Sequence, residues 1–145
     1  MPIAHNVSAD AVGLENLSIC LALRRAVFVD EQGVDPAIDA DGLDDGATQF
    51  LAWASGMPIG TARLRIVDGD AKAERLAVLD DFRGHGVGRA LMDAVERNVR
   101  AQGLTSVFLH AQQAVVPFYE RLGYAAAGAT FDEAGIPHRR MTKRL

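Results

Sequence analysis

Arg83-Gly84-His85-Gly86-Val87-Gly88-Arg89-Ala90-Leu91 lies between a short apolar segment, Leu76-Ala77-Val78-Leu79, and a strongly amphipathic stretch that predicts a helix. Three glycines within five residues allow the backbone to take the positive φ angles that other residues avoid. A backbone that curls into the start of a helix directs several N–H groups at one point, where the helix dipole also favours negative charge. We therefore predict a phosphate-binding loop at residues 83–89, with the side chains of Arg83 and Arg89 closing on the same anion.

Two common phosphate loops do not fit this stretch. A dinucleotide-binding G-x-G-x-x-G that begins at Gly84 would need glycine at position 89, where the chain has Arg89. A Walker loop would need Gly-Lys followed by Ser or Thr, and no lysine follows these glycines. The pattern that fits is Arg-x-x-Gly-x-Gly, formed by Arg83, Gly86 and Gly88. Taken alone, this pattern is also compatible with a simple glycine-rich turn between a strand and a helix.

The bulk properties predict one soluble domain over residues 1–145. No apolar run approaches the ~18 residues needed to cross a membrane, and no signal peptide is visible at the N-terminus. The single cysteine, Cys20, excludes an internal disulfide and lies among apolar residues at helical spacing, so we expect a core residue in a cytoplasmic protein. No basic patch interleaved with aromatic residues is present, so nucleic acid is not an expected partner.

Residues 30–46 form an acidic loop in a chain whose net charge is −4. The loop contains no lysine or arginine and seven acidic residues: Asp30, Glu31, Asp35, Asp39, Asp41, Asp44 and Asp45. Such a loop attracts cations, so one hypothesis is that it borders the site of a cationic substrate. The alternative is that its carboxylates cap turns or pair with Arg24 and Arg25.

Hydrophobic periodicity predicts the order β-α-β-β-β-α-β-α-β-β. We expect strands at 3–7, 48–54, 59–67, 71–79 and 104–111, a closing hairpin of 124–131 with 138–143, and helices at 14–29, after the glycine loop as far as Gly103, and up to Leu122. An Asp68-Gly69 turn links the third and fourth strands. A right-handed crossover makes strand 104–111 parallel to strand 71–79. The predicted class is α/β (α+β), an antiparallel meander feeding a βαβ unit in a mixed sheet flanked by helices.

The glycine pattern, this element order and the segment Phe118-Tyr119-Glu120-Arg121-Leu122-Gly123-Tyr124 resemble the GNAT superfamily of N-acetyltransferases over nearly the whole chain. Residues 24–32 contain Arg-x-x-Val-Phe-Val-x-Glu-Gln, and this segment and residues 131–138 resemble segments of one bacterial GNAT subfamily. That subfamily tends to carry His where this chain has Gln49, which leaves position 49 without an assigned role.

The resemblance implies that acetyl-CoA is the co-substrate, and we predict no metal. It assigns the coenzyme pyrophosphate to the loop Arg83, Gly84, His85, Gly86, Val87, Gly88 and Arg89. It assigns the pantetheine arm and the thioester carbonyl to the backbone of Leu76, Ala77 and Val78. Gln112 lies where the family often has Asn, and it would make a similar amide contact. No His, Cys or Asp set in the chain has the spacing of a zinc site.

Tyr119 occupies the family's tyrosine position and is the predicted general acid that protonates the departing thiolate; the alternative is a helix aromatic that only packs. Glu74 is the predicted general base, since alternation places it on the face of Leu76 and Val78, where desolvation would raise its pKa. The alternative for Glu74 is a cross-strand ion pair with Arg63 or Arg65, which would make it a weaker base. His110, His138 and water are the other candidates for the base.

The predicted function is transfer of an acetyl group to a primary amine by direct attack in a ternary complex. The acceptor is a small molecule or a peptide of unidentified structure, and a cationic amine is one expectation. The alternatives are a longer-chain acyltransferase, a coenzyme A-binding module without catalysis, and a nucleotide-binding βαβ protein, which the absent lysine disfavours. A membrane is not an expected partner, and a homodimer is left open.

Overall fold

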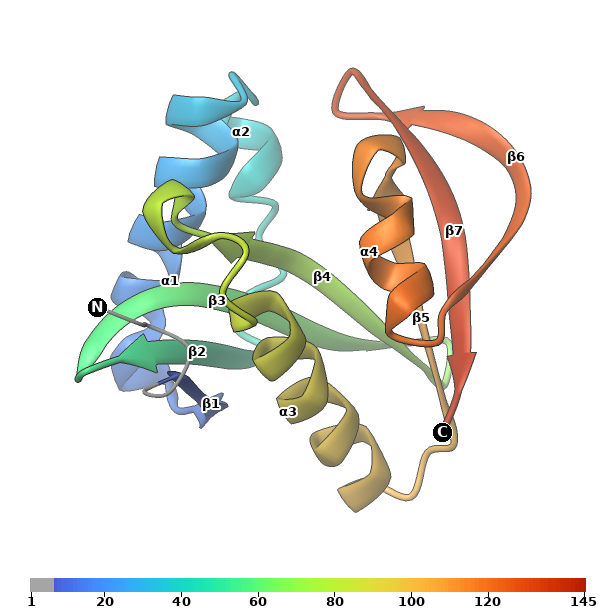
Figure 1. The fold of residues 1–145 in the computed structure, drawn as a ribbon, viewed down its shortest axis with the longest axis horizontal. Coiled ribbons are helices and arrows are strands. Elements are labelled where there is room, and N and C mark those ends of the chain that lie inside the picture. Colours follow the sequence, from blue (N-terminus) through green and yellow to red (C-terminus); the bar gives the residue numbers. More distant parts are fainter. Residues whose placement is uncertain (1–6) are drawn as a thin grey trace.

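The computed structural model describes residues 7–145. These residues form one seven-stranded sheet with helices packed on it, as Figure 1 shows. Its order is β1-β2-β3-β4-β5-β7-β6, and β4 with β5 is the only parallel pair among the strands described. The strands are β1 (Val7–Val12), β2 (Thr48–Ala54), β3 (Met57–Val67), β4 (Asp70–Val78), β5 (Ser106–Gln112), β6 (Ala125–Glu133) and β7 (Ile136–Arg144). The predicted antiparallel meander and its βαβ unit are confirmed.

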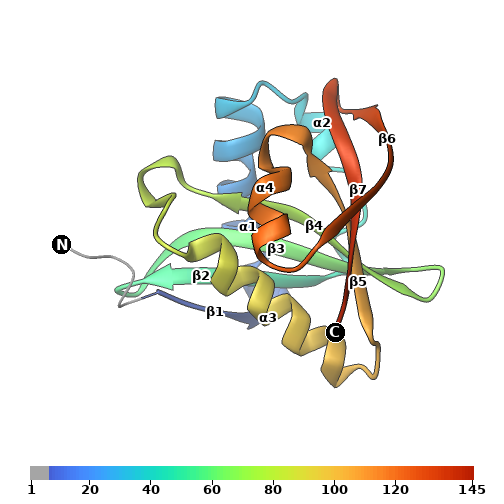
Figure 2. The ribbon, with the colours of Figure 1, turned by 45° about the vertical axis from the view of Figure 1, so that its right-hand side comes forward.

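Within the described residues, four α-helices cover the two faces of the sheet. They are α1 (Leu17–Arg24), α2 (Pro36–Asp39), α3 (Val87–Ala101) and α4 (Val116–Arg121). A 3₁₀ turn (Leu14–Asn16) precedes α1, and a π-helical segment (Arg25–Glu31) follows it. In Figure 2, α3 and α4 lie in front of the sheet, and α1 and α2 lie behind it. No helix within residues 7–145 is long and apolar enough to cross a membrane.

One predicted segment lies largely outside the described residues, and another differs from the structure. The strand predicted at 3–7 falls almost entirely outside the described residues, and the first strand observed is β1. The acidic loop is also more ordered than its composition suggested, because the helix continues to Glu31 and α2 forms within the loop. Asp35 explains where α2 begins: its carboxylate accepts a hydrogen bond from the Ala37 N–H at 2.9 Å, and Pro36 follows at the first helical position.

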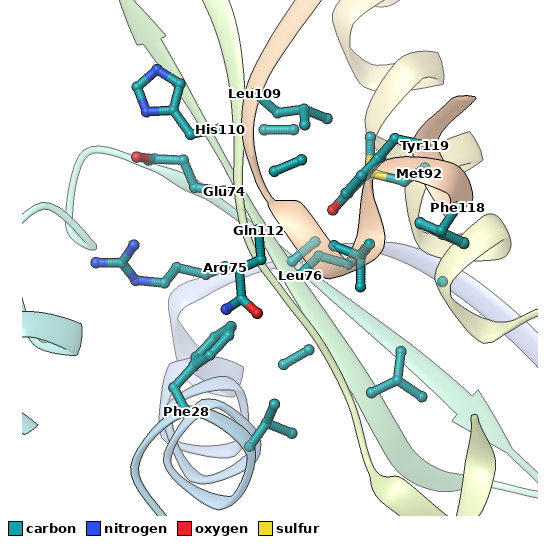
Figure 3. A pocket seen from close by; sticks show the side chains of 18 of the residues that line it. Phe28, Glu74, Arg75, Leu76, Met92, Leu109, His110, Gln112, Phe118 and Tyr119 are labelled. Atoms are coloured by element: carbon teal, nitrogen blue, oxygen red, sulfur yellow. The ribbon is translucent and has the colours of Figure 1, made fainter. Parts of the chain in front are cut away.

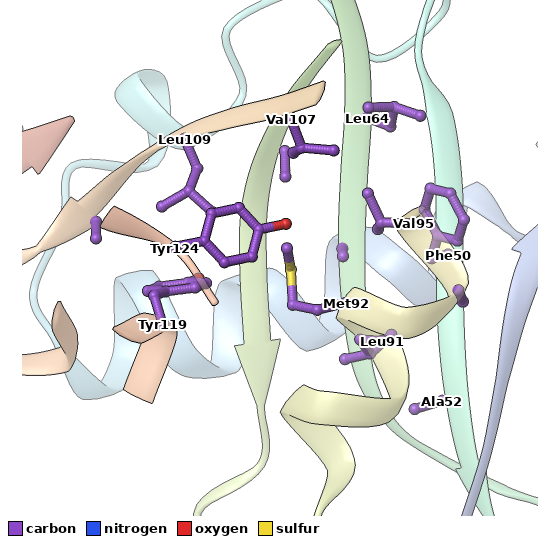
Figure 4. Packing of buried hydrophobic residues seen from close by; sticks show 14 of the residues in the cluster. Phe50, Ala52, Leu64, Leu91, Met92, Val95, Val107, Leu109, Tyr119 and Tyr124 are labelled. Carbon is purple, nitrogen blue, oxygen red and sulfur yellow. The ribbon is translucent and has the colours of Figure 1, made fainter. Parts of the chain in front are cut away.

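The main core lies between α3 and the sheet. Figure 4 shows Leu91, Met92 and Val95 of α3 packed against side chains of the strands. The strand residues of this cluster include Phe50, Leu64, Val107 and Leu109. Cys20 is fully buried on the opposite face, where it packs with Leu23 and Leu51, so its predicted place in the core is confirmed.

A bulge in β4 opens the middle of the sheet. The Asp68-Gly69 turn pairs Arg63 with Glu74, but the next pair in the ladder is Thr61 with Ala77. Two residues of β4 therefore face one residue of β3, and Arg75 takes a positive φ of 56°. Beyond this point β4 no longer pairs with β5, whose contact with it is limited to Ala71–Ala73. The two parallel strands thus separate into a V-shaped gap.

Candidate active site

A pocket of about 800 Å³ lies where β4 and β5 separate. Figure 3 shows its lining, which comes from β4, β5, the glycine loop, α3, α4 and the π-helical segment. The pocket brings together almost every residue predicted for the site: Glu74, Leu76, Ala77, Val78, Arg83, Gly84, Gly86, Val87, Gly88, Arg89, Gln112 and Tyr119. His85 is the exception, since it belongs to the loop but does not line the pocket.

The glycine loop ends in an uncapped helix N-terminus. Gly84 and Gly86 have positive φ angles of 79° and 81°, and Gly86 is the N-cap of α3. No side chain caps the first turn of α3, whose N–H groups have no earlier carbonyl within the helix to bond. Gly88 is needed for a different reason: a Cβ there would lie 2.9 Å from Cζ of Phe118, which packs α4 against the loop. The loop therefore presents free backbone donors to an anion in the pocket.

The two arginines of the loop differ in their partners, contrary to the expectation that both close on one anion. Arg83 forms a bidentate ion pair with Glu31, in which Nη2 lies 2.7 Å from Oε1. Its Nε donates to the Val78 carbonyl at 3.0 Å. For Arg89, the described part of the chain shows no carboxylate partner. Arg89 is therefore the cation of this loop that is available to an anion.

The bulge also changes which way the β4 side chains point. Glu74 and Arg75 both contact the side of the sheet that carries α1 and α2, and they lie side by side in Figure 3. Leu76 and Val78 pack instead against the core under α3. The prediction that Glu74 shares a face with Leu76 and Val78 is therefore wrong, because the positive φ at Arg75 interrupts the alternation of the strand.

Glu74 is held by three cations. Its carboxylate accepts hydrogen bonds from Arg63 Nη2 at 3.1 Å and Arg65 Nη2 at 3.1 Å, and Lys72 Nζ lies 3.3 Å away. Burial alone would raise the pKa of Glu74, but the hydrogen bond from Arg65 and the charges of Arg63 and Lys72 lower it to about 2. This argues against Glu74 as the general base, because a carboxylate with so low a pKa is a poor proton acceptor.

Glu74→Gln is therefore expected to cost stability: the free energy of unfolding should fall by about 3 kcal/mol at pH 7, since a buried ion-pair partner is lost. The pKa of Glu74 is lower in the folded chain than its ordinary value of 4.5. Its stabilising contribution is thus complete above pH 4.5 and is lost as the pH falls to about 2. Urea unfolding of both proteins at several pH values measures this.

The control is the exposed Glu120→Gln on α4, which should change the unfolding free energy by less than ~0.5 kcal/mol. The difference between wild type and Glu74→Gln should shrink as the pH falls from 4.5 to about 2. Unchanged stability, combined with loss of the rising limb of the pH–rate profile, would instead restore Glu74 to the role of base.

Tyr119 is 7% exposed and directs its hydroxyl into the pocket (Figure 3). Its ring packs edge-on against Phe118 and Tyr124, with centroid distances of 4.9 and 5.8 Å. Burial raises the pKa of the phenol above its ordinary value, so the hydroxyl keeps its proton near neutral pH. Packing and proton donation are compatible here, and the role of Tyr119 as general acid stays a prediction.

The end of the π-helical segment touches both sides of the pocket. Gln112, at the end of β5, donates through Nε2 to Gln32 Oε1 at 2.9 Å, while Glu31 holds Arg83 across from it. Neither Glu31 nor Gln32 was predicted as a site residue. The available signal was their position at the end of the subfamily-like segment 24–32.

The acidic loop is tied down by buried arginines. Arg24 bonds Asp39 and Asp44, and Arg63, which is fully buried, bonds Asp41 with both terminal nitrogens at 2.9 and 2.7 Å. These hydrogen bonds hold the pKa of Asp41 well below its ordinary range. Of the two interpretations of the loop, pairing with Arg24 is confirmed. A cationic substrate would have to compete with these arginines for the aspartates.

Gln49, which had no predicted role, belongs to the same network. Its side chain is buried, and Nε2 donates to Asp44 Oδ1 at 3.0 Å. Position 49 therefore helps to hold the acidic loop against β2.

Two histidines and one carboxylate form a cluster in the lining of the pocket. His110 Nδ1 lies 3.0 Å from Glu133 Oε1, and His138 Nε2 lies 3.7 Å from Glu133 Oε2. All three residues line the pocket. Within residues 7–145 no three His, Cys, Asp or Glu side chains are arranged to hold a metal ion.

Comparison with known proteins identifies related sequences and the same fold elsewhere. The family model described as "Acetyltransferase (GNAT) domain" matches residues 9–145. A Bacillus subtilis (strain 168) protein with a provisional acetyltransferase name is 41% identical over 133 residues, which cover 90% of each chain. Two solved structures are also similar. A provisionally named N-acetyltransferase from Lactobacillus plantarum has a TM-score of 0.86 and 30% identity over 95% of this chain and 99% of the other. An acyl-CoA N-acyltransferase from Pseudomonas aeruginosa has a TM-score of 0.81 and 29% identity over 94% and 98%.

Proposed function

Because the chain belongs to the GNAT family of acetyltransferases, we propose that it transfers the acetyl group of acetyl-CoA to a primary amine. One observation carries the proposal: a single pocket contains the uncapped start of α3, the unpaired edge of β4 and the hydroxyl of Tyr119. Acyl transfer from coenzyme A requires an anion-binding site for the pyrophosphate, a strand edge that can bond the pantetheine amides, and a proton donor for the thiolate. The similarity to an acyl-CoA N-acyltransferase supports the same donor.

The pocket fits the coenzyme at two places. The N–H groups at the start of α3 and the guanidinium of Arg89 would bind the pyrophosphate, since Gly84 and Gly86 leave open space where a Cβ would stand. The backbone of Leu76, Ala77 and Val78 pairs with β3 on one side and has no partner on β5 on the other. Apart from the Val78 carbonyl, which Arg83 Nε bonds, the groups on this open edge would bond the amides of the pantetheine arm. A free N–H on this edge would also polarise the thioester carbonyl.

The reaction is direct attack within a ternary complex. The neutral amine nitrogen forms a bond to the thioester carbon, whose C=O electrons move onto oxygen. When they return, the C–S bond breaks and sulfur leaves as a thiolate. Tyr119 gives its hydroxyl proton to that sulfur and recovers a proton from the acylated nitrogen through solvent. The products are an amide and free coenzyme A.

Isothermal titration calorimetry with acetyl-CoA, using ATP as the control ligand, tests the donor. We expect saturable binding of acetyl-CoA and none of ATP, because the loop lacks the Walker lysine. A panel of primary amines with detection of released thiol then tests the transfer. Failure to bind acetyl-CoA would overturn the proposal, and binding without turnover on any amine would favour a coenzyme-binding module.

A further inference from the structure

Among the carboxylates that line the pocket, Glu133 is distinguished by its partners. The pocket lining contains four acidic residues: Asp39, Asp41, Glu74 and Glu133. The first three are paired with arginine or lysine side chains. Glu133 is paired only with His110 and His138 among the described residues, and its side chain is 44% exposed. A positively charged amine that enters the pocket therefore meets one carboxylate that no guanidinium or lysine already neutralises.

The β6–β7 hairpin holds Glu133 in place. Glu133 and Ile136 face each other across the turn Ala134-Gly135, whose φ angles are 53° and 74°. Two pairs further along the hairpin, Phe131 pairs with His138, and their rings are stacked with centroids 6.1 Å apart. The ring of His110 on β5 lies edge-on to Phe131 at 5.0 Å. Three strands thus fix the carboxylate between two imidazoles.

In its neutral form, His138 has an acceptor nitrogen for which residues 7–145 supply no donor. Its Nδ1 lies 2.7 Å from the Ile136 carbonyl, which can only accept, so Nδ1 carries the hydrogen. In the neutral imidazole Nε2 therefore has a lone pair, and this lone pair faces Glu133 Oε2 at 3.7 Å. The ring is 6% exposed. Two acceptors that face each other in a pocket need a donor between them, and an ammonium group has three.

We propose that Glu133 and His138 bind the ammonium group of the acceptor and that His110 takes its proton. This proposal rests on the proposed acetyl transfer and names the amine end of the same pocket. His110 donates through Nδ1 to Glu133, so its Nε2 carries the lone pair of a base. Since Nδ1 is the ring nitrogen that faces Glu133, the ammonium gives one proton to Nε2 through a solvent molecule, and the resulting amine attacks the thioester. His110 then releases that proton to solvent, so each turnover yields one free proton.

The charged groups around His110 come from three elements. They are Glu133 on β6, Arg140 on β7, which is the strand partner of His110, and the Lys72–Glu74 pair on β4. The guanidinium of Arg140 lies over the Phe108 ring at 4.1 Å, next to His110 in the sheet.

Binding of an ammonium can be tested without a known acceptor. The histidine side-chain NMR signals of the full-length protein are followed during titration with n-propylammonium chloride, with n-propanol as the neutral probe. We expect the His110 and His138 signals to shift with the ammonium and not with the alcohol. In Glu133→Gln the apparent affinity should weaken at least ~10-fold, since an acceptor-only carboxylate becomes a neutral amide.

The matched control is Asp132→Asn, which removes the same charge from the adjacent residue, whose side chain does not line the pocket. It should bind n-propylammonium as the wild type does. Histidine signals that do not respond, or that respond equally in wild type and Glu133→Gln, would overturn the proposal. This result is independent of acetyl-CoA binding, whose failure would instead overturn the proposed function.

Kinetics separate the two roles on whichever amine the panel identifies. Glu133→Gln should raise the KM for the amine at least ~10-fold with unchanged Kd for acetyl-CoA. His110→Gln should lower kcat by ~10²-fold and remove the rising limb of its pH profile. An unchanged pH profile in His110→Gln would exclude His110 as the base.

Discussion

Gly86→Val is expected to weaken acetyl-CoA binding by at least ~10²-fold, or beyond detection, while the domain still folds. Gly86 has a φ of 81°, which a β-branched residue avoids, and it is the N-cap of α3. The valine must therefore shift the loop or place its branched side chain where the anion would approach. Either change removes backbone N–H donors from the proposed pyrophosphate-binding site at the start of α3. Calorimetric titration with acetyl-CoA measures the loss.

Gly56→Val is the control variant for the effect of backbone strain alone. Gly56 has nearly the same φ, 80°, and also has open space around it, but it lies in the β2–β3 turn and does not line the pocket. Both variants should lose about 1–3 kcal/mol of stability from the backbone, and Gly56→Val should keep its affinity for acetyl-CoA. Equal affinity of Gly86→Val and wild type for acetyl-CoA would contradict the proposed pyrophosphate-binding site at the start of α3.

Tyr119→Phe is expected to lower kcat by ~10²-fold or more with little change in the Kd for acetyl-CoA. Phenylalanine keeps the edge-on contacts with Phe118 and Tyr124 and removes only the hydroxyl that points into the pocket. Because burial raises the pKa of this phenol, the proton that it would donate is present throughout the neutral range. Single-turnover measurements of thiol release would report the chemical step.

A second tyrosine provides the matched control. Tyr124 donates its hydroxyl to Glu96 Oε2 at 2.9 Å in the core and does not line the pocket. Tyr124→Phe should therefore cost about 1.5–3 kcal/mol of stability, through a lost hydrogen bond to a charged group, with kcat nearly unchanged. If Tyr119→Phe also affected stability alone, the tyrosine would be a packing residue and another group would protonate the thiolate.

Prediction from sequence succeeded where local patterns control structure. Residues 48–54 form β2 as expected, and the amphipathic helix after the glycine loop ends before Gly103, whose φ is 80°. The Asp68-Gly69 turn has the predicted two-residue form, which sets the pairing of Arg63 with Glu74. Turn chemistry and helix caps act over a few residues, so they can be recognised without knowledge of the fold.

The candidate site was predicted less completely. Glu74 was assigned the wrong face because the bulge at Arg75 has no sequence signal comparable to a glycine. The ion pairs of Arg63 with Asp41 and of Arg83 with Glu31 join residues 22 and 52 positions apart in the chain. Sequence patterns based on residue spacing cannot predict contacts between residues so far apart in the chain. The charge state of a group in the pocket depends on these long-range neighbours, and so does the choice of base.

The sequence alone determined that residues 83–89 form a glycine-rich loop that leads into a helix, because glycine conformation is a local property. It also determined the order of the strands and of the helices other than α2. Only the tertiary structure decided which side chains meet in the pocket. The bulge in β4 separates two parallel strands, the buried arginines neutralise Asp39, Asp41 and Glu74, and the β6–β7 hairpin brings Glu133 to His110. Those contacts depend on packing between distant segments, which no local pattern records.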